Sequence, residues 1–329
     1  MAHKLSFFTL LLLTALLSSC AQSTERSAIP PASTATLTRT SAPTLTPTPE
    51  STSAPTAIPT LSVNAAHARL LDLLANNGGC RLPCLWGITP GETTYQEAQA
   101  ILVPLGSISD LVAGFSPNAG SVFPVYAEGD FMLSTTVGVD TKTLFGHQIV
   151  NSISFKADES KKMIASNGET VFADFFDSKI FSQRVHPYTL SQVLFDYGKP
   201  AAVFISTDGG IEREKNTPGF YILLIYPDQG LLVHYTTYRQ LIDGKVRGCP
   251  ANAHVELDLY PSGDADAFSK SLSKTDWASF ADLEPIDNPF WKSIDKATSM
   301  SLDQFYETFR EPTDKCIETP LKGWYVPER

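Results

Sequence analysis

The five cysteines carry the most distinctive chemistry in this sequence. Cys80 and Cys84 are separated by three residues, whereas thioredoxin-type active sites have two residues between their cysteines. A zinc site would need further Cys or His at metal-ligand spacing, and none follows. In an oxidising compartment, Cys80, Cys84, Cys249 and Cys316 therefore predict two structural disulfides.

Four cysteines permit three pairings. We favour Cys80–Cys84 and Cys249–Cys316, because the first two are close in sequence and frame a tight Arg-Leu-Pro turn. On the chain-entropy model, closing the long loop from 249 to 316 contributes about 4 kcal/mol of stability.

Motifs of catalysis are absent from the sequence. It contains no Gly-X-Ser-X-Gly elbow, His-Glu-X-X-His pair, phosphate-binding glycine loop or dinucleotide-binding glycine pattern. Beyond the N-terminus the histidines stand singly, which is typical of packing or sheet-surface residues; they are His67, His147, His186, His234 and His254. We therefore predict no catalytic residue, metal or cofactor. A carboxylate pair for glycoside hydrolysis stays possible, but the sequence does not select one.

The acidic run from Asp258 to Asp266 resembles a calcium loop in composition only. It lacks the glycine and the closing glutamate at EF-hand offsets. Asp264 and Asp266 serve equally well as N-caps of a helix that holds Phe268 and Leu272.

Four aromatic residues inside the long cysteine loop are a candidate binding surface: Trp277, Phe280, Phe290 and Trp291. Long loops on a rigid scaffold often carry function, and Trp is enriched at binding hot spots. The alternative is that these rings seal a helical piece onto the preceding sheet.

The N-terminus predicts export. A positive start at Lys4 precedes the apolar run Leu5–Leu17, which is too short to span a bilayer and is typical of a signal peptide over residues 1–19. The run ends in Leu17-Ser18-Ser19-Cys20, which resembles the lipobox of bacterial lipoproteins. This resemblance implies that Cys20 receives diacylglycerol with palmitate-type acyl chains and becomes the mature N-terminus. Because Ala21 is not Asp, outer-membrane sorting is permitted in a cell that has an outer membrane.

Residues 20–63 predict a disordered stalk, because positions 22–63 contain 25 Ser, Thr or Pro in 42 residues. Its prolines favour extended conformations that reach on the order of 100 Å. The whole chain has a net charge of −10 and no basic stripe. Nucleic acid is therefore excluded as a partner. We expect the protein on the extracytoplasmic face of the membrane, held by its lipid, with an envelope protein or glycan as partner.

The body predicts an α+β fold. Helices are expected over 65–75, after an N-cap at Thr93, and after Thr189 and Ser301. Strands are expected near 107–112, 121–127, 130–140 and 146–156, and again near 201–206, 219–226, 231–238 and 253–260. This pattern gives two tandem units of a helix plus a four-stranded antiparallel sheet, at 64–160 and 161–262, and a helical C-terminal segment at 263–329.

Two short runs, Gly-X-X-X-Gly-X-Thr-X-X-Glu-Ala at 87–98 and helix-Gly-X-Pro-strand at 189–206, carry a further resemblance. They are similar to units of the outer-membrane-assembly lipoproteins of the SmpA/BamE type and of the β-lactamase-inhibitor-protein fold. The resemblance implies a protein-binding scaffold without catalysis. The leading hypothesis is thus a non-enzymatic binding or scaffold module, and the alternative is a hydrolase of cell-wall or extracellular polymer.

Overall fold

The computed structural model describes residues 61–108, 114–165, 167–176, 179–207, 218–264 and 291–324. Cys20, the signal peptide, residues 20–60 of the stalk and the predicted surface residues Trp277, Phe280 and Phe290 lie outside the described residues. The described part mixes helices with antiparallel strands, which confirms the α+β class. None of its helices has the length and apolar character needed to span a membrane.

The described α-helices are α1 (Val63–Asn76), α2 (Tyr95–Leu102), α3 (Lys179–Arg184), α4 (Leu190–Tyr197), α6 (Ile294–Ala297) and α7 (Leu302–Phe309). Of these, α1, α2 and α7 begin at side-chain N-caps, whereas Thr189 and Ser293 precede α4 and α6 without a capping hydrogen bond. The N-cap of α2 is Thr94 and not the predicted Thr93, because Thr94 forms a capping box with Glu97. Ser301 caps α7 in the same way with Gln304, as predicted.

Eleven of the described strands form one sheet, in the order β1-β2-β4-β5-β12-β9-β8-β7-β13, with β3 on β4 and β6 on β5. A smaller sheet has the order β10-β11-β14. The strands are β1 (Gly114–Phe115), β2 (Ala119–Val122), β3 (Val125–Glu128), β4 (Phe131–Leu144), β5 (His147–Ile164), β6 (Thr170–Asp174), β7 (Ala202–Thr207), β8 (Pro218–Tyr226), β9 (Leu231–Tyr238), β10 (Gln240–Ile242), β11 (Lys245–Gly248), β12 (His254–Leu259), β13 (Trp291–Ser293) and β14 (Ile317–Pro320).

Several expectations about strands need correction. Residues 103–108 form a 3-10 helix where a strand was expected near 107–112, and the expected strand at 121–127 is divided into β2 and β3. The expected boundary at residue 160 falls inside β5. The described part of the C-terminal segment includes β13 and β14, so it is not wholly helical.

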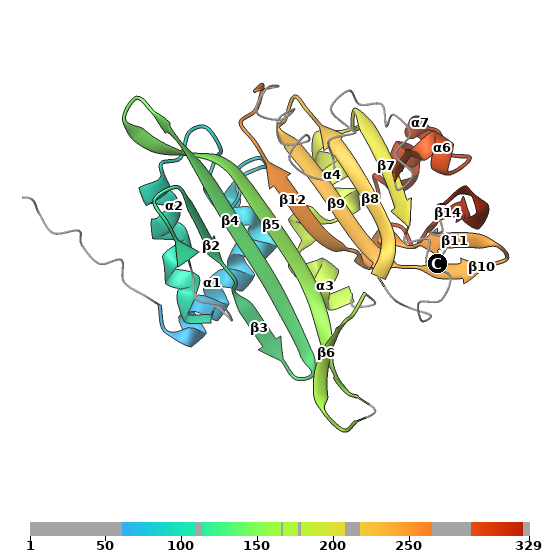
Figure 1. Cartoon of the computed structure of the whole chain (residues 1–329), viewed down its shortest axis with the longest axis horizontal. Helices are drawn as coiled ribbons and strands as arrows, with labels where there is room; N and C mark the ends of the chain where they lie inside the picture. The colour runs from blue at the N-terminus through green and yellow to red at the C-terminus, as the bar shows by residue number, and fades with distance from the viewer. Residues whose placement is uncertain are drawn as a thin grey trace, which may run out of the picture. The chain divides into compact units, whose positions relative to one another are not determined.

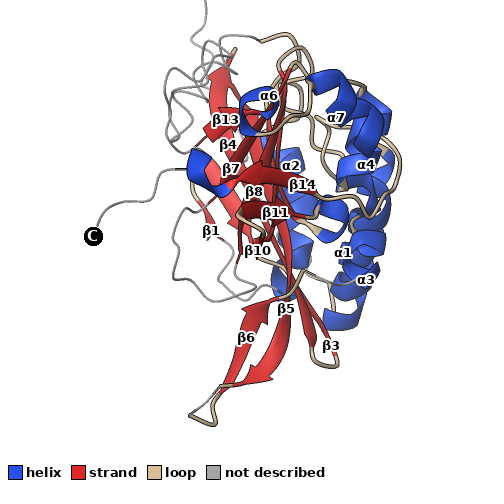
Figure 2. Ribbon diagram, turned by 90° about the vertical axis from the view of Figure 1, so that its right-hand side faces the viewer, coloured by secondary structure: helices blue, strands red, loops and turns tan. Residues whose placement is uncertain are grey.

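The two expected groups of strands lie in one continuous sheet. Strand β5 of the first group pairs with β12 of the second, with Leu257 opposite Phe155, and Figure 1 shows them side by side. Helices α1, α3 and α4 lie on one side of this sheet (Figure 2). In the middle of β4 and β5, every second side chain points toward them and is buried, including Val137, Val139 and Phe155. The opposite face of the sheet, on the side away from α1, α3 and α4, is called the helix-free face below, because these described helices do not cover it.

A buried polar network ties the N-terminal helix to the second group of elements. The Asn77 amide donates to the carbonyls of Cys80 (2.9 Å) and Cys84 (2.8 Å). Its carbonyl oxygen accepts from the Tyr188 hydroxyl at 3.0 Å and from the backbone of Trp86. The Trp86 indole donates to the same hydroxyl at 3.0 Å. Four groups that burial would otherwise penalise are thus satisfied together.

Candidate functional site

The most chemically diverse surface in the described residues lies on the helix-free face, where β5 and β12 meet. Their alternation buries Phe155 and Leu257 against the helices, so the intervening polar residues face the other way. These residues are Lys156, Asp158, Glu256 and Asp258. In the ladder, Glu256 lies opposite Lys156 on one side and His234 of β9 on the other. Asp158, Glu256 and Asp258 are called the carboxylate cluster below.

Glu256 is held in its ionised form. His234 Nδ1 lies 3.8 Å from Glu256 Oε2, a separation that a small side-chain movement converts into a hydrogen bond. Hydrogen bonding to His234, followed by the charge of that ring and of Lys156, lowers the pKa of Glu256 despite partial burial. Lys156 also pairs with Asp158 at 3.3 Å.

Asp258 is shifted in the opposite direction. Burial, and then the negative charge of Glu256, raises the pKa of Asp258 to about 7. Burial also raises the pKa of Asp158; Lys156 opposes this rise and Glu256 adds to it. Neighbouring carboxyl groups with diverging pKa values are a recurring feature of sites that transfer protons or bind polar ligands.

Three rings flank the carboxylate cluster. Tyr221 of β8 stacks on His234 with centroids 5.6 Å apart, and Trp291 of β13 lies 5.8 Å from His234 and 6.4 Å from Tyr221. We call these three residues the aromatic trio. Beyond it, the same face carries buried apolar side chains with Trp291 packed against them: Phe204, Leu223, Ile225 and Leu232. The polar part of the face therefore extends from the trio toward β4 and β2.

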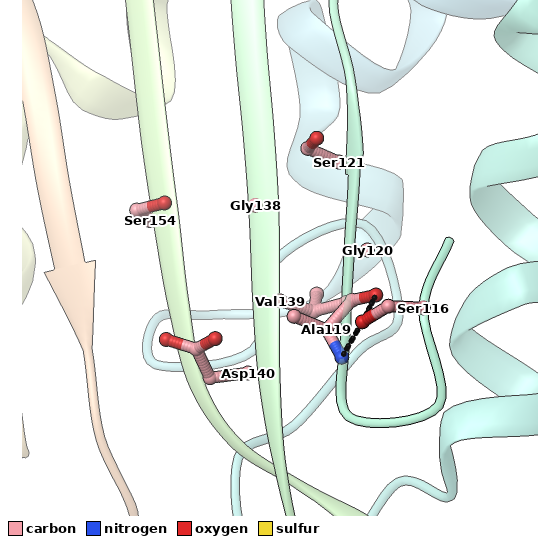
Figure 3. A pocket seen from close by; sticks show the side chains of 8 residues that line it. All are labelled: Ser116, Ala119, Gly120, Ser121, Gly138, Val139, Asp140 and Ser154. Carbon is pink, nitrogen blue, oxygen red and sulfur yellow. Dashed lines mark hydrogen bonds between the residues drawn. The ribbon is translucent and has the colours of Figure 1, made fainter. Parts of the chain in front are cut away.

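A shallow hollow of about 480 Å³ lies on that side (Figure 3). It is lined by Ser116, Ala119, Gly120, Ser121, Gly138, Val139, Asp140 and Ser154. Gly138 keeps it open, because a Cβ there would lie 2.7 Å from the Ser154 hydroxyl. Ser154 also lies opposite Asp258 in the ladder. The hollow therefore begins on β5, directly beside Asp258 of the carboxylate cluster.

The isolated histidines have different surroundings. His254 is buried, and its ring stacks on Phe176 at 3.9 Å while Nε2 lies 3.1 Å from the backbone nitrogen of Glu159. Burial lowers the pKa of His254 to about 4, so this histidine is the neutral packing residue that was predicted. His234 instead contacts Glu256 and the other two rings of the aromatic trio, and the strand pattern did not indicate that role.

The cysteines pair in the preferred arrangement. Cys80–Cys84 and Cys249–Cys316 are joined, with Cα separations of 5.9 and 4.1 Å. The second bridge connects the end of β11 to the start of β14, which are already paired through Gly248 and Ile317. Within the described residues, no group of three His, Cys, Asp or Glu side chains is arranged to hold a metal ion.

The alternating pattern at 253–260 predicted that Glu256 and Asp258 share the polar face of one strand. It did not predict the residues that lie beside them, which are Lys156, Asp158, His234 and Tyr221. The alternation of Ser154, Lys156 and Asp158 was a usable signal. The pairing of β5 with β12, however, joins residues about 100 positions apart. Of the four predicted surface aromatics, Trp291 is described, and it lies against this site.

No protein-family model matches the chain. No curated protein and no solved structure is significantly similar to it either. The candidate function therefore depends on the geometry of the helix-free face and on the chemistry of the N-terminus.

Proposed function

We propose that this chain is a lipid-tethered cell-envelope protein whose body binds a ligand on the helix-free face. The lipobox at Leu17–Cys20 and the Ser/Thr/Pro-rich stalk support the tether. The observation that carries the binding function is the placement of the carboxylate cluster between the aromatic trio and the hollow.

A glycan is the ligand class that this arrangement suits best. Carboxylates and a lysine hydrogen-bond to sugar hydroxyls, and the faces of Trp and Tyr rings pack against the apolar faces of sugar rings. Glu256 and Lys156 are exposed and Trp291 is half-buried, so the ligand would reach both kinds of group from solvent. A protein ligand is the competing outcome of the test below.

The test is titration calorimetry of the mature chain, with Cys20 replaced by Ser, against soluble fragments of cell-wall glycan. We expect Glu256→Gln and Trp291→Ala each to weaken binding by roughly tenfold or more, as loss of a central contact does. Glu307→Gln on α7, an exposed carboxylate on the other side of the sheet, is the matched control. If no glycan binds and the immobilised chain retains a protein, the ligand class is protein and not glycan.

A second candidate function is hydrolysis of a glycan on the same face. The specific observation is that the pKa of Asp258 is raised to about 7 while that of Glu256 is lowered. The two residues alternate on one face of β12, so their Cα atoms are about 7 Å apart. Glycosidases use one protonated and one ionised carboxyl group, which flank the scissile bond and lie about 5–10 Å apart. Asp258 would then donate a proton to the leaving oxygen, and Glu256 would act as base or nucleophile.

Hydrolysis and binding are separable by one variant. Release of reducing ends from wall polymer should fall as the pH rises through about 7, because Asp258 then loses its proton. Asp258→Asn should abolish release while leaving glycan affinity within roughly threefold. Binding without any release of reducing ends would rule out the hydrolase and retain the binding module.

We also infer that the sheet is built from two tandem units joined edge to edge. Support comes from the β5–β12 pair, which has strands of the first group on one side and strands of the second on the other. The resemblance to SmpA/BamE-type lipoproteins and to the β-lactamase-inhibitor-protein fold, which the sequence runs at 87–98 and 189–206 carry, is a second argument for tandem units. A crystal structure that pairs β5 with a strand other than β12 would contradict it.

A further inference from the structure

The hairpin formed by β5 and β6 extends beyond the rest of the large sheet (Figure 2). Strand β4 begins at Phe131 opposite Lys161, and β12 pairs with β5 only as far as Ala157. From Lys162 onward, β6 is therefore the neighbour of β5 within the described ladder. This end of the hairpin, Lys162–Phe172, is called the hairpin tip below.

The hairpin tip exposes apolar side chains on both of its faces, although its turn is polar. Met163 and Val171 lie opposite each other and are 52% and 40% exposed. Ile164 and Phe172, which point to the other face, are 69% and 49% exposed. A hairpin that stays in water normally has at least one polar face. Contiguous exposed apolar side chains of this kind mark surfaces that contact a protein or a membrane.

The first described helix, α1, begins at the same end. Helix α1, which follows the stalk, places His67 against Tyr126 of β3 with ring centroids 5.3 Å apart. Strand β3 pairs Glu128 with Phe131, which in turn lies opposite Lys161 at the base of the hairpin tip. Figure 1 shows the start of α1 and the β5–β6 hairpin at the lower end of the body.

We propose that the hairpin tip inserts its apolar side chains into the outer layer of the lipid bilayer to which the chain is tethered. This proposal goes beyond ligand binding. It rests on the proposed lipid tether, because the tether is the reason that a lipid surface is the expected partner. A tethered body meets the bilayer at a high effective concentration, so a contact that is weak by itself becomes populated. Lys161 and Lys162 at the base of the tip suit the headgroup region. In this pose the sheet stands upright on the membrane, and the helix-free face stays accessible.

The experiment replaces the lipid with a tag, so that it does not depend on acylation. The mature chain, with an N-terminal polyhistidine tag in place of Cys20, is bound to vesicles of phosphatidylethanolamine and phosphatidylglycerol that contain a nickel-chelating lipid. An environment-sensitive fluorophore is attached at Ile164→Cys or, as the matched control, at Phe145→Cys. Phe145 is 94% exposed in the turn at the opposite end of β5.

We expect a blue shift of emission on vesicle binding for the fluorophore at position 164 and no shift at position 145. Adding Met163→Glu and Phe172→Glu should abolish the shift without changing the thermal unfolding temperature, because both side chains are exposed. Equal emission at the two positions on vesicles would overturn the proposal. A shift that needs no vesicles and grows with protein concentration would instead assign the hairpin tip to a second copy, through the β6 edge. Glycan affinity measured on the same variants keeps this outcome separate from that of the proposed function.

Discussion

Asn77 shows how one polar side chain organises a region of the core. It is 3% exposed, has a left-handed backbone (φ 53°) and makes hydrogen bonds to four partners. Asparagine tolerates this conformation better than most residues, and its amide both donates and accepts. No other side chain of similar size satisfies the two carbonyls of the Cys80–Cys84 loop and Tyr188 together.

Asn77→Ala should therefore lower the free energy of unfolding by about 2–4 kcal/mol, since it leaves buried partners unpaired and puts alanine, which adopts positive φ less readily than asparagine, at this position. Asn77→Gly removes the backbone strain only and should recover about 1 kcal/mol of that loss. Urea denaturation measures both. Asn76→Ala, a neighbouring exposed position, is the control, and an equal loss there would contradict the role given to Asn77.

Asp258 makes the stability depend on pH. Its pKa is about 7 in the folded protein and near 3.8 when unfolded, so the folded state holds the proton more tightly. Stability is therefore highest below the unfolded pKa and falls as the pH rises through about 7. Asp258→Asn should stabilise the protein at about pH 8 by on the order of 2 kcal/mol and have little effect near pH 4.

Urea unfolding of Asp258→Asn at the two pH values measures this difference. Asp140→Asn, an exposed carboxylate on the same face, should change little at either pH. A stabilisation of equal size at both pH values would show that the cause is not the ionisation of Asp258. A carboxylate retained at a cost to stability is typical of a functional group.

At the scale of elements, the Cys249–Cys316 disulfide and ion pairs between β11 and β14 stabilise the small sheet. Glu318 of β14 accepts from Lys245 at 3.0 Å and also pairs with Arg247, both on β11. Gly248 permits the close approach of this sheet to β8, because a Cβ there would lie 2.2 Å from the Phe220 ring. The small sheet therefore packs against β8 at Gly248, where no side chain would fit.

The two disulfides should differ in their contribution to stability. On the chain-entropy model, replacing both Cys249 and Cys316 with Ala costs about 4 kcal/mol, whereas replacing Cys80 and Cys84 costs about 2 kcal/mol because the closed loop is much shorter. Guanidinium denaturation of the two double variants compares them. The reverse order would mean that native contacts around Asn77, and not loop closure, dominate the effect of the shorter bridge.

At the scale of the whole molecule, we propose that a lipid anchor and a stalk hold the body at a membrane. Replacing Cys20 with Ser should move the protein from the membrane fraction to the soluble fraction or leave it unprocessed, because a lipid with two or three chains supplies most of the membrane affinity. Fractionation followed by mass measurement of the N-terminal peptide checks this. Ala21→Ser is the control. Unchanged membrane association of the Cys20 variant would contradict the lipid assignment.

If both proposals hold, the hairpin tip and the tether together determine the orientation of the body at the membrane. If both the hairpin tip and the lipid contact the bilayer, the body lies at the membrane surface. If only the lipid contacts it, the length of the stalk determines how far the body lies from the membrane. The same fluorescence measurement that tests the hairpin tip distinguishes these two states.

Elements that depend on interactions between neighbouring residues could be predicted from the sequence. Caps predicted the start of α7 and the end of α1, and alternation predicted β7, β8, β9 and β12 to within a few residues, because both signals act over a few neighbouring positions. Glu256 and Asp258 were placed on a polar strand face for the same reason. The favoured cysteine pairing also agrees with the structure.

Features that depend on the pairing of strands far apart in the sequence became visible only in the folded structure. The β5–β12 ladder merges two expected sheets into one and brings Lys156 and His234 to Glu256. Short strands such as β13 and β14 lack the length for a periodic signal, so they were missed. Burial of Asp258 beside Glu256, which raises its pKa, follows from the same packing. Register and burial are properties of the assembled sheet, and no local run of residues encodes them.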